Sequence, residues 1–169
     1  MFGYGSLAVG CAGRRARLLG YRRVWGVAMD NRITIPGYKC YRLRADGSRP
    51  QVYVAFLDVV EDAGAATEGM LLAIDDVALR ALDERERNYE RIDVGARVAE
   101  APGRVWAYRG TAAGRARLQR GLRQGSAVVD RGYLRAVRAG FAAAGIADDA
   151  DPGELAIMDL ERIDLAPAP

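Results

Sequence analysis

The stretch FGYGSL, residues 2–7, places two glycines and a serine directly after a Phe-x-Tyr run. It fits a short strand that ends in a tight turn, because glycine adopts backbone conformations that other residues avoid. It fits a binding loop equally well, because glycines leave backbone N–H groups open to close approach by a ligand. These six residues allow both interpretations, and the rest of the sequence must separate them.

The composition is that of an ordinary globular domain, with 50% hydrophobic and 28% charged residues among 169. A chain of this length favours a single domain with a substantial core. We expect that domain to span residues 1–147. Residues 148–169, which begin acidic and end Ala-Pro-Ala-Pro, are expected to form a partly ordered tail. No apolar run reaches 18 residues and no basic-then-apolar leader opens the chain, so we expect neither a membrane partner nor a signal peptide.

The basic excess does not by itself indicate a nucleic-acid partner. The formal net charge is +3, and Lys39 is the only lysine among 25 basic residues. The arginines are spread along the chain and mixed with acidic residues, whereas a phosphate-binding face needs them clustered. We therefore expect a small-molecule ligand and no nucleic acid. The sequence does not fix the oligomeric state.

Cysteine and histidine usage narrows the chemistry. Cys11 and Cys40 match no metal-ligand spacing and no disulfide framework, which favours two reduced thiols in a cytoplasmic protein. The 169 residues contain no histidine. This excludes a Ser-His-Asp or Cys-His triad and a His-ligated zinc site within them. Proton transfer must fall to Asp, Glu, Tyr, Cys or Lys39.

The order of predicted elements favours an α+β fold, because helices are inserted among strands without strict β-α-β alternation. Strands are predicted over residues 21–29, 51–60, 69–74, 89–99 and 103–110. Residues 61–68 read as a loop, residues 8–20 are ambiguous with a helical turn before Gly20, and residues 111–124 allow no assignment.

The best-defined helix is predicted over residues 130–144. Asp130 can cap its start, and Gly145 fits a C-terminal stop. Leu134, Val137 and Phe141 form one apolar stripe at helical spacing, so this face is expected to pack on the core.

The helix predicted over residues 76–88 carries a carboxylate on its apolar face. Asp75 or Asp76 can cap it. At about 100° per residue, Leu79, Leu82 and Glu86 share one face. Glu86 is then either a solvated residue of the last turn, paired with Arg87 or Arg91, or a carboxylate at the mouth of an apolar pocket. Burial there would disfavour its charged form and suit it to acid/base work.

Two motifs together suggest a family. The first is Tyr4-Gly5-Ser6-Leu7, and the second is Leu82-Asp83-Glu84-Arg85-Glu86, followed by Tyr89 and a strand. In this order, with the strand EGMLLAI before the helix, the chain resembles the gamma-glutamylcyclotransferase-like superfamily, which includes the ChaC-type glutathione-specific enzymes. The stretches AMDN (28–31) and PGYK (36–39) also resemble bacterial stand-alone members. The resemblance spans residues 2 to about 141, although Arg87 stands where many members have glycine.

The resemblance implies a small, mixed, barrel-like sheet with flanking helices. It also implies conversion of a γ-glutamyl amide or peptide to 5-oxoproline and a free amine, without a metal or an organic cofactor. Glu86 matches the catalytic glutamate, which acts as general acid/base. The Tyr4, Gly5, Ser6 and Leu7 loop would bind the γ-glutamyl group through its backbone N–H groups.

Other residues are candidates for substrate contacts. Tyr89 and Tyr133 resemble aromatic positions that border the family's pocket, and Asn31 is a further candidate polar contact. The leaving amine is not specified by the motifs: glutathione, a γ-glutamyl amino acid, or an amine of antibiotic or polyamine metabolism would each fit. The non-enzymatic alternative is a binding module for a small acidic ligand on the same fold.

Overall fold

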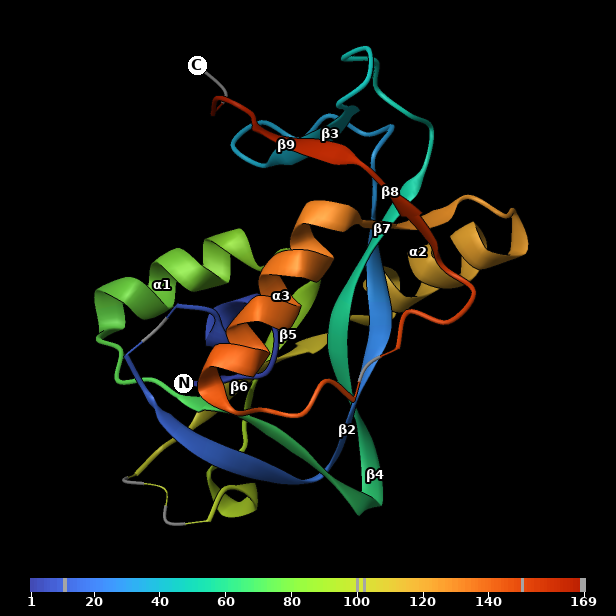
Figure 1. The fold of residues 1–169 in the computed structure, drawn as a ribbon. Helices are drawn as coiled ribbons and strands as arrows, with labels where there is room; N and C mark the ends of the chain where they lie inside the picture. The colour runs from blue at the N-terminus through green and yellow to red at the C-terminus, as the bar shows by residue number, and fades with distance from the viewer. Residues whose placement is uncertain (11, 100, 102, 150, 168–169) are drawn as a thin grey trace.

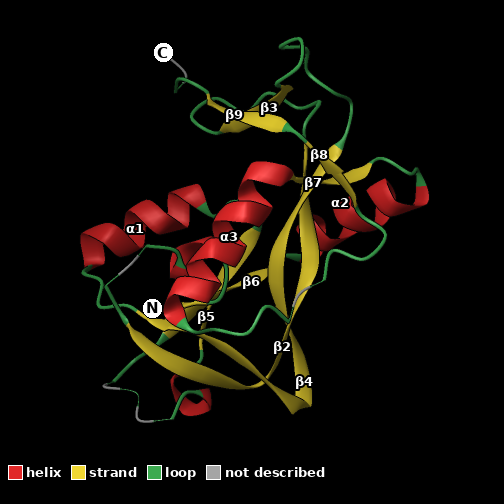
Figure 2. Cartoon of the chain, in the orientation of Figure 1, coloured by secondary structure: helices red, strands yellow, loops and turns green. Residues whose placement is uncertain are grey.

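The computed structural model describes residues 1–10, 12–99, 101, 103–149 and 151–167. Strands and three α-helices in this part of the chain form an α+β fold (Figures 1 and 2). The longest strands, β2 (Arg14–Asp30) and β4 (Tyr53–Leu71), make a twisted antiparallel ribbon. Cys40 is a buried free thiol, whereas Cys11 lies outside the described residues.

The strand β4 organises the main sheet because both of its edges are used. β2 pairs with one edge along nearly the whole of β4. On the opposite edge, the short strand β1 (Phe2–Gly3) pairs antiparallel with the end of β4, and β7 (Ala127–Asp130) pairs parallel with its start. Within the described residues no strand pairs with this edge between Val54 and Met70. Leu57 lies in the resulting gap.

The remaining strands form two separate pairs. β3 (Lys39–Leu43) pairs with β9 (Leu160–Asp164), and β5 (Tyr89–Asp93) pairs with β6 (Trp106–Gly110). The α+β class with a mixed sheet and flanking helices is confirmed. The sheet is not closed into a barrel, because β3–β9 and β5–β6 are separate two-stranded sheets that do not pair with the edges of the main sheet.

The loop predicted over residues 61–68 is wrong, because β4 continues through it. Glu61 and residues 66–68 pair with the first part of β2, and Glu68 lies opposite Arg17 in the ladder. The same pairing overturns the helical turn before Gly20, which has φ +77° beside a β-bulge between Leu19 and Tyr21. Ladder hydrogen bonds here outweigh a local composition typical of loops.

The three helices begin at side-chain caps. Asp75 caps α1 (Asp76–Arg85), Thr111 caps α2 (Ala112–Arg123) and Asp130 caps α3 (Arg131–Ala144). The predictions of α3, its Asp130 cap and its Gly145 stop are confirmed, and Leu134, Val137 and Phe141 are buried. Figure 1 shows α1 and α2 on opposite sides of the upper part of the β2–β4 ribbon. None of the described helices is long and apolar enough to span a bilayer.

Two strands lie within the described part of the segment expected to form a partly ordered tail. β8 (Ala156–Met158) pairs parallel with β7, and β9 pairs antiparallel with β3 over five residue pairs. Figure 1 shows β3 and β9 together above α1 and α3. The last strand therefore belongs to the folded unit and forms part of the wall of the cleft described below.

Candidate active site

The first sequence motif and Glu86 line one small recess. Its volume is about 30 Å³, enough for a small polar group. The lining residues are Tyr4, Gly5, Ser6, Leu7, Leu57, Glu86, Tyr89, Tyr108 and Tyr133. The recess lies beside the gap along β4, because Leu57 belongs to both. Segments separated by more than 70 residues are thus brought to one place.

The turn after β1 exposes backbone donors. β1 leads into the short 3₁₀ helix η1 (Ser6–Ala8), and the Ala8 N–H donates to the Gly5 carbonyl at 2.9 Å. This is the first hydrogen bond of the turn, so the N–H groups of Ser6 and Leu7 have no acceptor within η1. A Cβ atom on Gly5 would lie 3.5 Å from the Tyr133 hydroxyl. The side chains of Tyr133 and Leu57, whose Cβ and Cδ1 would lie 3.6 Å away, therefore cover this part of the loop.

Glu86 stands at the C-terminal end of α1. Its N–H donates to the Leu82 carbonyl at 2.9 Å, and its own carbonyl accepts from the Tyr89 N–H at 2.8 Å. Both backbone groups are engaged, which fixes the direction of the side chain. That side chain is 17% exposed, and its Oε1 accepts a 2.7 Å hydrogen bond from Nη2 of Arg85. The carboxylate is thus shielded in part and paired with Arg85, not with Arg87 or Arg91.

The predicted face of α1 is present. Leu79, Leu82 and Glu86 are half-buried, whereas their neighbours on the helix are exposed. Asp83 has a different role: its Oδ1 accepts a 2.7 Å hydrogen bond from the Tyr108 hydroxyl, and its Oδ2 pairs with Arg91 at 2.9 Å. The aspartate of the second motif therefore fixes α1 to β5 and β6, which holds Glu86 at the recess.

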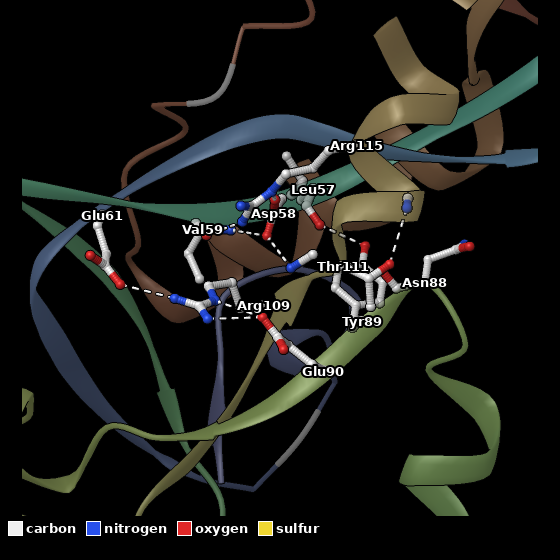
Figure 3. Close-up of polar contacts among 12 residues, drawn as sticks. Leu57, Asp58, Val59, Glu61, Asn88, Tyr89, Glu90, Arg109, Thr111 and Arg115 are labelled. Carbon is white, nitrogen blue, oxygen red and sulfur yellow. Dashed lines mark hydrogen bonds and ion pairs between the residues drawn. The ribbon is translucent and has the colours of Figure 1, made fainter. Parts of the chain in front are cut away.

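Two of the tyrosines that line the recess donate their hydroxyls to backbone carbonyls. Tyr89 donates to the Leu57 carbonyl at 2.7 Å, as Figure 3 shows, and Tyr4 donates to the Tyr108 carbonyl. Burial raises the pKa of Tyr4 and of Tyr89 well above the ordinary value, and nearby acidic groups add to this. Burial also raises the pKa of Tyr133. These hydroxyls therefore stay protonated near neutral pH and cannot take up a proton there.

A buried carboxylate next to the recess holds its scaffold. Asp58 is fully buried in β4 and accepts from the Gly110 N–H at 2.6 Å and from Nε of Arg115 at 2.9 Å. Figure 3 shows that these contacts join β4 to β6 and α2, on the side of Leu57 and Tyr89. Asp58 follows Leu57 directly, so the same network positions the carbonyl that Tyr89 contacts.

A larger cleft of about 1070 Å³ opens outward from the recess. The two cavities share Ser6, Leu7, Glu86, Tyr89 and Tyr133. The outer part is lined by β3 and β9 through Lys39, Tyr41, Arg162 and Asp164. Glu86 lies where the two cavities meet.

Of the predicted site residues, Asn31 alone lies outside both cavities. It is fully buried, and its side-chain amide bonds the backbone of Tyr41 at 2.8 and 2.9 Å and the carbonyl of Pro50 at 3.0 Å. All its polar atoms are engaged, so Asn31 ties the β2 turn to β3 and has no group left for a substrate. Within the described residues no set of three His, Cys, Asp or Glu side chains could hold a metal ion.

Comparison with known families identifies the family of the chain. The family model described as gamma-glutamyl cyclotransferase, AIG2-like, matches residues 1–127, three quarters of the 169 residues. The chain belongs to this family. Members of this gamma-glutamyl cyclotransferase family are enzymes, and the family implies a γ-glutamyl substrate. Among curated proteins no significant match is found.

The match to the cyclotransferase family covers part of the site. It includes the Tyr4–Leu7 loop, Glu86 and Tyr89 but ends before Tyr133 and β9. Sequence reasoning did not assign a site role to Tyr108, Leu57 or Arg162. Only tertiary pairing brings these residues to the site, and an isolated tyrosine or arginine carries no signal for it. One feature of the sequence did single out Lys39: it is the only lysine in an arginine-rich chain.

Proposed function

We propose that this chain is a cyclotransferase that converts a γ-glutamyl amide or peptide to 5-oxoproline and a free amine. One observation carries the proposal: Glu86 lines the same recess as the Tyr4–Leu7 loop. A carboxylate and open backbone N–H groups on one small cavity supply what this reaction requires. Family membership supports the same reading.

The nucleophile belongs to the substrate. The α-amino nitrogen attacks the γ-carbonyl carbon, the ring C–N bond forms, and the bond from that carbon to the leaving nitrogen breaks. One proton passes from the attacking nitrogen to the leaving nitrogen. Glu86 takes up that proton and returns it, so the enzyme ends unchanged. No protein nucleophile is needed, which agrees with the absence of histidine from the 169 residues.

Binding and positioning complete the proposed mechanism. The N–H groups of Ser6 and Leu7 face the γ-glutamyl group and stabilise its carboxylate or the developing oxyanion. Tyr133 and Tyr4 wall the recess and exclude water. Because ring closure needs a curled substrate, a cavity that confines the glutamyl part lowers the entropic cost of reaching the reactive geometry.

The experiment is 5-oxoproline release from a panel of glutathione, γ-glutamyl amino acids and γ-glutamyl amines. Glu86→Gln is assayed alongside, with Glu161→Gln as the matched control on an exposed position of β9 outside both cavities. We expect Glu86→Gln to lower the rate by roughly 10² to 10⁴ and the control to leave it unchanged. The panel also decides whether glutathione, the substrate of ChaC-type enzymes, is used.

Two results would contradict the proposal. If Glu86→Gln retains turnover within a factor of a few, the acid/base role is wrong. If folded wild-type protein releases no 5-oxoproline from any substrate, the alternative of a small-ligand binding module takes its place.

A further inference from the structure

The outer cleft places a lysine across from the recess. Lys39 is the first residue of β3, and β3 together with β9 lines the far side of the cleft. Glu86 lies in both cavities. A γ-glutamyl substrate whose reacting carbonyl enters the recess would therefore extend its leaving amine past Glu86 into the cleft that Lys39 lines.

The ammonium of Lys39 is set against aromatic rings. Its Nζ lies 4.2 Å from the centroid of the Phe56 ring and 5.5 Å from that of Tyr38. The carboxylates that attract it, those of Glu86 and Asp164, form their ion pairs with arginines instead. Ring faces stabilise a cation only in part once water is removed. Lys39 is thus a cation in a cleft with little counter-charge of its own.

The charged groups that face Lys39 come from α1 and β9. Glu86 and Asp164 favour its charged form, whereas Arg162 and Arg85 oppose it. Burial, with a smaller contribution from Arg162, lowers the pKa of Lys39 to about 8. The attraction from Glu86 and Asp164 is not sufficient to restore the ordinary value.

The acidic neighbours already have partners. Asp164 pairs with Arg162 at 2.7 Å, and Glu86 pairs with Arg85 at the same distance. Asp130 also lines the cleft, but its carboxylate accepts from three backbone N–H groups, those of Gly132, Tyr133 and Leu160. The two carboxylates that attract Lys39, those of Glu86 and Asp164, are thus already engaged with arginines, and a ligand carboxylate can supply the missing counter-charge.

We propose, resting on the proposed cyclotransferase function, that Lys39 is a specificity-determining residue that binds a carboxylate on the leaving amine. The preferred substrates are γ-glutamyl derivatives of amines that carry an acidic group, such as γ-glutamyl amino acids. Derivatives of neutral or cationic amines are disfavoured, because they leave the Lys39 ammonium without a partner. Arg87, whose guanidinium lies 5.4 Å from the Tyr38 ring centroid, adds positive charge on the same side of the cleft.

The test compares two substrates that differ only in that carboxylate: γ-glutamylalanine and γ-glutamylethylamide. We expect wild-type kcat/KM to favour γ-glutamylalanine by about ten- to a hundredfold, the size of one charge-assisted contact. Lys39→Met should bring the ratio near one, mainly through KM for γ-glutamylalanine, and Lys39→Arg should keep part of it. Arg80→Met, an exposed cation of α1 outside both cavities, is the control and should keep the full ratio.

Calorimetry on Glu86→Gln protein separates this inference from the proposed function. We expect γ-glutamylalanine to bind more tightly than γ-glutamylethylamide. At pH 8.5, in two buffers of different ionisation enthalpy, its binding should take up a fraction of a proton, because a bound carboxylate raises the pKa of Lys39 from about 8. Lys39→Met should lose both effects. These results would support the role of Lys39 even without turnover. Equal affinity for the two ligands, or a Lys39→Met variant that lowers kcat on both substrates alike, would overturn it.

Discussion

The hydroxyl of Tyr89 donates a 2.7 Å hydrogen bond to the backbone carbonyl of Leu57, inside the gap that β1 and β7 leave along β4. A side chain here occupies the place of a strand partner. The edge of the sheet can thus open toward the recess without leaving this carbonyl unsatisfied. The candidate site exists because the main sheet is interrupted at this position.

Removing that hydroxyl should cost stability. We expect Tyr89→Phe to lower the free energy of unfolding by about 1 kcal/mol, because a mostly buried carbonyl loses its donor while the ring still packs. Chemical denaturation measures the change. Tyr21→Phe, at a buried tyrosine outside both cavities, is the control. Equal losses in the two variants would show that the Leu57 contact contributes nothing in particular.

The two glycines of the first motif should respond differently to alanine. A Cβ on Gly3 would lie 2.9 Å from the Leu7 carbonyl carbon, so Gly3→Ala forces the backbone apart and destabilises the fold. A Cβ on Gly5 meets nothing closer than 3.5 Å, and its φ of −141° lies outside the left-handed region. We expect Gly5→Ala to fold with a free energy of unfolding within about 1 kcal/mol of wild type.

The same Gly5→Ala variant should nevertheless lose activity, because the added methyl group enters the recess beside the Tyr133 hydroxyl. The paired measurement is denaturation together with 5-oxoproline release. If Gly5→Ala lost stability and activity in proportion, the FGYGSL stretch would be a tight structural turn and not a binding loop.

Local sequence signals were sufficient to predict α3 and the apolar face of α1. The Asp130 cap, the Gly145 stop and the spacing of Leu134, Val137 and Phe141 lie within one segment, so sequence alone specified that helix. The face shared by Leu79, Leu82 and Glu86 was predictable for the same reason. Helical periodicity needs no knowledge of the partner surface.

Contacts between distant segments explain what the sequence did not reveal. Residues 61–68 look like a loop, yet Glu61 and residues 66–68 pair with β2 residues that lie 40 to 51 positions earlier in the chain. Lys39 lies opposite Asp164 in the β3–β9 ladder, so one wall of the cleft joins residues 125 positions apart. Asn31 was a candidate polar contact with the substrate, but its side chain is engaged in tertiary hydrogen bonds to Tyr41 and Pro50. No local pattern encodes such pairings.

The two members of the Asp58–Arg115 ion pair should contribute unequally to the free energy of unfolding. Asp58 is fully buried, whereas the Arg115 side chain is 38% exposed. Asp58→Ala removes the acceptor of the Gly110 N–H as well as the partner of Arg115, so we expect a loss of about 2–4 kcal/mol. Arg115→Ala leaves Asp58 with its two backbone donors, Val59 and Gly110, and should cost less. Denaturation of both variants gives the order, and a larger loss for Arg115→Ala would contradict this account.

The last prediction concerns pH and Lys39. The pKa of Lys39 is about 8 in the folded chain, against an ordinary 10.5. Between these values the unfolded chain binds more protons at this position than the folded chain does, so the contribution of Lys39 to stability rises with pH. Below pH 8 the charged ammonium is held in both states, and the folded state bears its full desolvation cost. Lys39→Met removes that cost, so it should be more stable than wild type at pH 7, with an advantage that shrinks toward pH 10.

Tyr38 also titrates abnormally, because burial raises its pKa to about 12. It keeps its proton in the folded chain and lowers stability above pH 10, but it does so in both proteins and cancels in the difference. Urea denaturation of the two proteins at pH 7, 8, 9 and 10 measures this difference. A gap that does not change with pH would mean that Lys39 titrates normally in the cleft, which would also remove the proton uptake expected when a carboxylate binds there.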